Sequence, residues 1–199
     1  MSNLRPNIFI ALGVVGLILP LLFIGVAIAY SPWFNIANNA LSDLGHAVRS
    51  NIASIFNFGL CLGGFIVGAH AVYYILPTDR LFGSLLTLSC FNLVLIAVFD
   101  EVYGMLHFIV SVTFFIMLAA FLIVYSIRFK SIAAMVAVVV SLVMWVLHFS
   151  YSIPKGAAIP ELISIVVFIP FYVRLLAMLR KKLDKERINP GGCGGPAGI

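Results

Sequence analysis

The amino-acid sequence predicts an all-α fold: a polytopic integral membrane protein that forms a six-transmembrane-helix bundle, with the N-terminus and C-terminus cytoplasmic. Composition, the length of the apolar runs and the placement of basic residues predict it. Of 199 residues, 63% are hydrophobic and only 10% are charged, and the mean hydropathy is +1.16. Because a water-soluble domain of this size needs a largely polar surface, most of the chain is expected to lie in lipid.

Apolar windows of about 20 residues, long enough to cross a hydrocarbon core, occur six times. The expected spans cover residues 8–30, 52–76, 81–99, 102–127, 131–150 and 161–179. Charged residues, Pro and Gly separate them. Since no long polar stretch offers a second domain, residues 1–188 are expected to form a single transmembrane helical domain, followed by a disordered Gly- and Pro-rich tail at 189–199.

The first span is too long for a signal-peptide core and is therefore expected to be retained. The connection after it, residues 31–49, is amphipathic. Its Trp33, Leu41 and Leu44 suit the membrane interface, where the connection acts either as an anchor or as a lid over the mouth of the bundle.

Small residues dominate one part of the second span, with glycines at both ends of residues 59–63 and of residues 64–68. Such patterns let helix backbones approach closely, so internal packing is expected, with homodimerisation as the alternative. Asn57 in this span is expected to bond Asn92 or Thr87 across the bundle.

The distribution of Lys and Arg predicts the orientation. With both termini cytoplasmic, only Arg49 and Lys155 lie outside. The ten basic residues that lie inside are Arg5, Arg80, Arg128, Lys130, Arg174, Arg180, Lys181, Lys182, Lys185 and Arg187. This excess favours anionic lipid headgroups over nucleic acid as the basic residues' counterpart.

Polar residues concentrate at the predicted extracytoplasmic end. Ser42, Asp43 and His46 follow the first span, and Ser42 and His46 share a face if this segment is helical. The structural alternative is that Ser42 or Asp43 caps a helix, which leaves His46 unexplained.

The turn between the third and fourth spans carries Asp100 and Glu101, with His107 in the first turns of the fourth span. Acids at a helix start also suit the helix dipole, but His107 needs a partner inside the membrane. His148 lies at a similar depth in the fifth span. Glu161 begins the sixth span after a proline and is interpreted mainly as a helix-start residue.

Three hypotheses use these groups. Ser42, Asp43, His46, Asp100, Glu101 and His107 are candidate catalytic residues. His46, His107 and His148 are candidate metal ligands, with zinc as the metal, for a metal-dependent lipid hydrolase. The same groups suit a proton-coupled small-solute transporter, or inter-helix hydrogen bonds with no chemistry. Membrane lipids are the expected partners, as ligand or surroundings, and nucleic acid is not expected.

The three cysteines, Cys61, Cys90 and Cys193, show no disulfide or thiolate-metal spacing.

The order of motifs, Asn39-x-x-Ser42-Asp43-Leu44-Gly45, then Phe99-Asp100-Glu101 with His107 downstream, resembles the six-span prokaryotic family called domain of unknown function 998. The resemblance covers nearly the whole chain and implies the six-span fold of a cell-membrane protein. It also implies that Ser42, Asp43, Glu101 and His107 matter, but it carries no activity. Where the family often has Phe-Pro-Glu, this chain reads Phe99-Asp100-Glu101.

A weaker resemblance links Ser42-x-x-x-His46 and Asp100 to alkaline-ceramidase-type membrane hydrolases, which use such groups around zinc. This chain departs from their pattern, because it has six expected spans instead of seven and lacks a His-x-x-x-His pair in its last helix.

Overall fold

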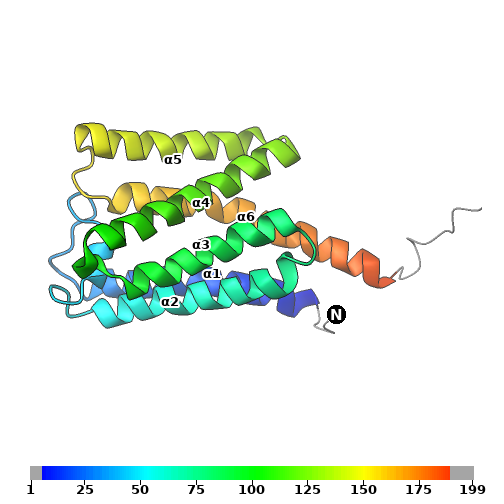
Figure 1. The fold of residues 1–199 in the computed structure, drawn as a ribbon, viewed down its shortest axis with the longest axis horizontal. Helices are drawn as coiled ribbons and strands as arrows, with labels where there is room; N and C mark the ends of the chain where they lie inside the picture. Colours follow the sequence, from blue (N-terminus) through cyan, green and yellow to red (C-terminus); the bar gives the residue numbers. More distant parts are fainter. Residues whose placement is uncertain (1–5, 189–199) are drawn as a thin grey trace, which may run out of the picture.

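The computed structural model describes residues 6–188, with side chains from Ile8 to Lys185, so the tail predicted to be disordered lies outside the described residues. The described chain is all-helical, as predicted (Figure 1). Its long helices are α1 (Pro6–Ala29), α2 (Ala53–His70), α3 (Arg80–Val98), α4 (Met105–Phe129), α5 (Ile132–Tyr151) and α6 (Ala158–Ile188). Its short helical segments are η1 (Leu41–Gly45), η2 (Ala71–Ile75) and η3 (Glu101–Tyr103).

Six of the described helices are long and apolar enough to cross a membrane, which confirms the prediction of a multi-pass membrane protein. Large apolar side chains cover their outer surface: Phe65 is 69% exposed and Leu22 is 59% exposed. Such a surface is stable only when hydrocarbon surrounds it. The sixth helix is longer than its predicted span, because Pro160 fits its first turn and the basic segment after residue 179 continues the helix.

The glycines of α2 are used inside the chain, as expected. A Cβ on Gly63 would touch the ring of Pro20 in α1, whereas a Cβ on Gly64 would lie 3.0 Å from the carbonyl oxygen of Cys90 in α3. The two glycine patterns therefore let α2 pack closely between α1 and α3.

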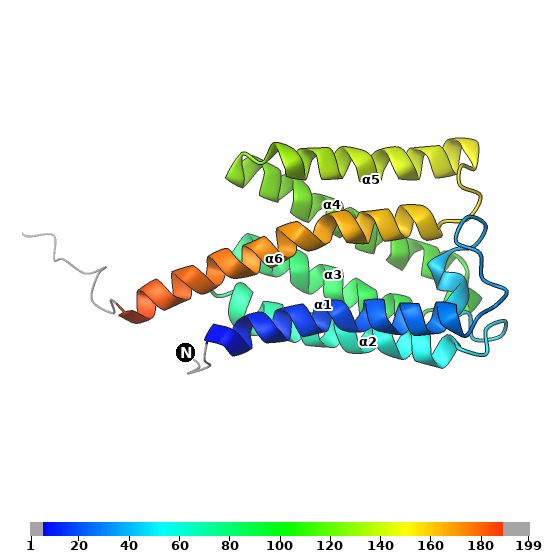
Figure 2. The ribbon, with the colours of Figure 1, turned by 180° about the vertical axis from the view of Figure 1, so that it is seen from behind.

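Helix α5 lies at one edge of the bundle and packs mainly against α4 and α6, while α1 and α2 lie at the opposite edge (Figures 1 and 2). The connections between α1 and α2, α3 and α4, and α5 and α6 gather at one end, which we call the mouth end. Helix α1 starts and α6 ends at the other end, which we call the terminal end.

Two basic residues at the terminal end form polar contacts within the chain. Arg128 forms a 2.6 Å salt bridge with Asp79, and Nζ of Lys182 donates to the carbonyl oxygen of Thr78 at 3.5 Å. The mouth end carries the acidic and histidine residues that the sequence singles out.

Candidate functional site

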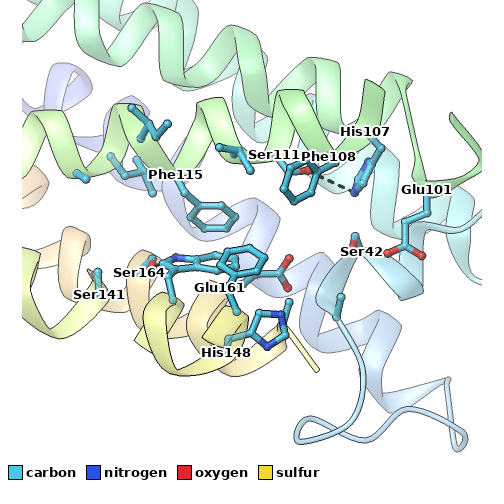
Figure 3. A pocket seen from close by; sticks show the side chains of 18 of the residues that line it. Ser42, Glu101, His107, Phe108, Ser111, Phe115, Ser141, His148, Glu161 and Ser164 are labelled. Atoms are coloured by element: carbon cyan, nitrogen blue, oxygen red, sulfur yellow. Dashed lines mark hydrogen bonds between the residues drawn. The ribbon is translucent and has the colours of Figure 1, made fainter. Parts of the chain in front are cut away.

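The mouth end contains a cavity of about 680 Å³, within the range of about 300–1,000 Å³ typical of ligand pockets (Figure 3). Helices α4, α5 and α6 form its walls, and the connections around η1 and η3 close it above. Its polar lining consists of Ser42, His46, Arg49, Glu101, His107, Ser111, Ser141, Trp145, His148, Glu161 and Ser164.

The cavity has two chemically different parts. Ser42, Glu101 and Glu161 mark the polar part near the mouth, and Leu118 and Leu122, in the middle of α4, line the apolar part. The two parts together fit a ligand that is polar at one end and apolar at the other.

Ser42 and Glu101 meet at the top of the cavity. The Ser42 hydroxyl donates to Oε1 of Glu101 at 2.7 Å. Burial raises the pKa of Glu101 to about 7; the hydrogen bond from Ser42 opposes this shift and the negative charge of Asp43 adds to it. The pair therefore holds a carboxyl group that changes charge near neutral pH.

Glu161 reaches from the first turn of α6 to the connection between α1 and α2. Its Oε2 accepts a 2.7 Å hydrogen bond from the backbone N–H of Leu41, 120 residues away. The residue is only 9% exposed, yet it lines the cavity, and its carboxylate points into it (Figure 3). Its role is therefore more than that of a helix-start residue.

The three candidate metal ligands, His46, His107 and His148, all line the cavity. Nδ1 of His107 donates to the carbonyl oxygen of Phe99 at 2.7 Å, and Nδ1 of His148 donates to that of Pro154 at 2.9 Å, because a carbonyl oxygen only accepts.

The other ring nitrogen of His107 lies 3.3 Å from the hydroxyl of Ser111, which donates to it in the neutral ring. In His46, Nδ1 accepts from the backbone N–H of Val48 at 3.3 Å. Among the described residues, no group of three or more His, Cys, Asp or Glu side chains is placed to hold a metal ion. The hypothesis of a zinc site at His46, His107 and His148 therefore finds no support in the geometry, because these three side chains are not grouped closely enough to hold one ion.

The carboxylates of Asp43 and Asp100 accept hydrogen bonds from backbone N–H groups, and neither residue is among those that line the cavity. Oδ2 of Asp43 accepts from the N–H of Ala40 and from the side-chain amide of Asn39, each at 2.9 Å, so Asp43 and not Ser42 caps η1. Oδ2 of Asp100 accepts from the N–H of Ala47 at 2.8 Å. These two candidate catalytic residues are placed to shape the connection above the cavity.

Further backbone contacts fix this connection. The N–H of Gly156 donates to the carbonyl oxygen of Ala37 at 2.9 Å, and that of Ala158 donates to Asn39 at 3.0 Å. The side-chain amide of Asn57 donates to the carbonyl oxygen of Gly45 at 2.8 Å, so its predicted bond to Asn92 or Thr87 is wrong. The polar end of the cavity therefore has a defined shape.

Sequence reasoning missed Ser141, Trp145 and Ser164, which line the cavity. The indole N–H of Trp145 donates to the hydroxyl of Ser164 at 3.1 Å, which ties α5 to α6. Ser141, Trp145 and His148 follow the i, i+4, i+7 spacing of one helix face, and this periodicity was the signal available in the sequence.

Comparison with known proteins identifies a family but no activity. Neither a curated protein nor a solved structure matches the chain, and the weaker resemblance to alkaline-ceramidase-type hydrolases finds no support. The family model described as "Protein of unknown function (DUF998)" matches residues 14–178, which is most of the chain and all of the cavity lining. The chain thus belongs to the DUF998 family.

Proposed function

We propose that this protein binds a membrane lipid in the cavity at the mouth end. The observation that carries the proposal is the division of one cavity into a polar part at Glu101 and Glu161 and an apolar part at Leu118 and Leu122. An amphipathic lipid satisfies both parts, because its headgroup needs hydrogen-bond partners and its chain needs an apolar surface.

The route from the bilayer supports this choice over a water-soluble solute. Phe108 and Ile116 on α4, and Leu142 and Phe149 on α5, line the cavity and are 49% to 60% exposed. These apolar side chains suit an opening between α4 and α5 toward the bilayer, through which a lipid chain would enter without crossing water.

The placement that we propose is the cell membrane, with the mouth end extracytoplasmic. It rests on the ten-to-two distribution of Lys and Arg that the sequence predicts between the cytoplasmic and the extracytoplasmic side. The lipid site then lies in the outer leaflet half of the bundle. The division of the cavity supports binding, and binding is the function that we propose.

A photoactivatable lipid with its crosslinking group in the chain tests the proposal. We expect it to label α4 and α5 of the purified full-length protein, and Ala119→Trp, which fills the apolar part, to reduce labelling at least fivefold. Ile109→Trp on the same helix is the matched control, because Ile109 is 53% exposed and does not line the cavity. Equal labelling of both variants and the wild type, once both are shown to be folded, overturns the proposal.

A further inference from the structure

Among the described residues, the acidic groups around the polar part of the cavity form no salt bridge, and Arg49 is the cation whose charge acts on Glu101. The salt bridges between described residues, Arg128–Asp79 and Arg180–Asp184, both lie at the terminal end. The hydrogen bonds that the mouth-end carboxylates accept in the described part of the chain come from backbone N–H groups, the Asn39 amide and the Ser42 hydroxyl, and Glu101 also shares a side-chain hydrogen bond with Asp43. A positive charge would therefore be stabilised there.

Two of these carboxylates face the cavity. Glu161 uses Oε2 to accept from Leu41, which leaves its Oε1 for a ligand, whereas Glu101 accepts from Ser42 through Oε1 and also shares a side-chain hydrogen bond with Asp43. Figure 3 shows both carboxyl groups at the end of the cavity that Ser42 occupies. The negative charge of Asp43 acts on Glu101 and strengthens the preference for a cation, and Arg49, a cation in the lining, acts against it.

A second, independent observation lies deeper in the cavity. Ser141 is one of the residues that line the cavity and is only 7% exposed, and its buried Oγ has no hydrogen-bond partner. A buried hydroxyl without a partner is costly, so a ligand atom that accepts a hydrogen bond would be stabilised here. Ser141 lies seven residues before His148 on α5, which places it about 10 Å deeper along the helix axis.

We infer that the bound lipid carries a primary ammonium headgroup held between Glu101 and Glu161, with an ester carbonyl that accepts from Ser141. This inference rests on the proposed function and names its ligand class. In an ethanolamine phospholipid the phosphate follows the amine, within reach of Arg49, and the ester carbonyls lie deeper, toward the chains. A choline headgroup has no N–H to donate to the carboxylates, and a glycerol headgroup brings a negative charge without an ammonium group.

The test is a titration of the delipidated full-length protein, followed by native mass spectrometry, with three phospholipids that differ only in the headgroup: ethanolamine, choline and glycerol. We expect the ethanolamine lipid to bind on the order of tenfold more tightly than the other two, as expected for one charge-assisted hydrogen bond. Glu161→Gln should bring the three within about twofold, because glutamine still accepts from Leu41 but carries no charge. Asp184→Asn at the terminal end is the matched control and should keep the preference.

Two further probes sharpen the assignment. Glycerophosphoethanolamine, which has the same headgroup but no chains, should not compete; competition at equal concentration overturns a lipid in favour of a free amine. An ethanolamine lipid with ether-linked chains lacks the carbonyls and should bind several-fold more weakly to the wild type but not to Ser141→Ala. Equal binding of ester and ether lipids by the wild type overturns the role of Ser141.

The outcomes separate the two proposals. Equal binding of all three headgroups, or preference for glycerol, overturns the ammonium inference and leaves lipid binding in place. Failure of the folded wild type to bind any of the three overturns both.

Discussion

The hydroxyl of Ser42 donates a 2.7 Å hydrogen bond to Oε1 of Glu101, 59 residues further along the chain. The bond joins the connection between α1 and α2 to the connection between α3 and α4, directly above the cavity. Because the pKa of Glu101 is raised to about 7, this junction changes its charge in the physiological pH range. The charged or titratable groups around it include Glu161, Asp43, Arg49, His46 and His107.

The stability of the protein should therefore fall as pH rises through 7. A carboxyl whose pKa is higher in the folded state stabilises the fold below its unfolded value of 4.5, and that contribution is lost as pH rises through about 7. The loss should be about 1–2 kcal/mol, less than the full shift implies, because solvent screens the partly exposed group. Thermal unfolding in detergent between pH 5 and pH 8 measures it.

Glu101→Gln should remove this pH dependence, because the amide does not titrate. Ser42→Ala should extend the loss to higher pH, since the hydroxyl favours the ionised carboxylate. Parallel pH profiles for the wild type and Glu101→Gln would contradict the assignment.

Asp100→Ala should destabilise the protein by about 1–3 kcal/mol. Asp100 is 7% exposed and accepts from the backbone N–H groups of Ala47 and Val102, so its removal leaves two donors without a partner. Asp184→Ala, which breaks only an exposed pair with Arg180, should change stability by less than about 0.5 kcal/mol. Chemical denaturation of both variants distinguishes them, and equal midpoints would refute a role for Asp100 in holding the connection.

Gly156→Ala should disturb the connection above the cavity. A Cβ at Gly156 would collide with the backbone of Asn38 and Asn39, atoms that cannot move independently of that connection. Gly25→Ala is the control, because a Cβ there meets nothing within 4 Å and alanine favours the helix by up to about 1 kcal/mol. We expect a lower melting temperature and weaker lipid labelling for Gly156→Ala alone. A normal melting temperature for this variant would show that the two connections do not pack as described.

The fold and the polar end of the cavity could be predicted from the sequence because lipid excludes charge. Six apolar runs predict six spans, and the few polar residues outside the terminal end, such as Glu101 and His107, must gather away from lipid. The helix face of a residue is less certain. His46, His107 and His148 were predicted to share a depth, but whether their rings converge depends on the rotation of α4 and α5 and on the path of the connection that carries His46.

Contacts between segments that are far apart in the chain could not be predicted from the sequence. Glu161 reads as an ordinary helix-start acid, yet it binds Leu41, because α6 starts beside the α1–α2 connection. In the sequence Ser141 looks like any serine in a membrane helix. Only the three-dimensional structure shows that its hydroxyl is buried without a hydrogen-bond partner. Hydrogen bonds between residues of such segments can be predicted only when the three-dimensional arrangement of the segments is known.

The proposed orientation makes a prediction about accessibility. Lys155 lies exposed in the connection between α5 and α6 at the mouth end, and Lys130 lies exposed between α4 and α5 at the terminal end. In a background with all native cysteines replaced by serine, Lys155→Cys should react with a membrane-impermeant maleimide in intact cells, and Lys130→Cys should react only after permeabilisation. The two positions control for each other, since both are exposed and both lose one lysine. Labelling of Lys130→Cys alone in intact cells would invert the topology, place the cavity on the cytoplasmic side and move its lipid to the inner leaflet.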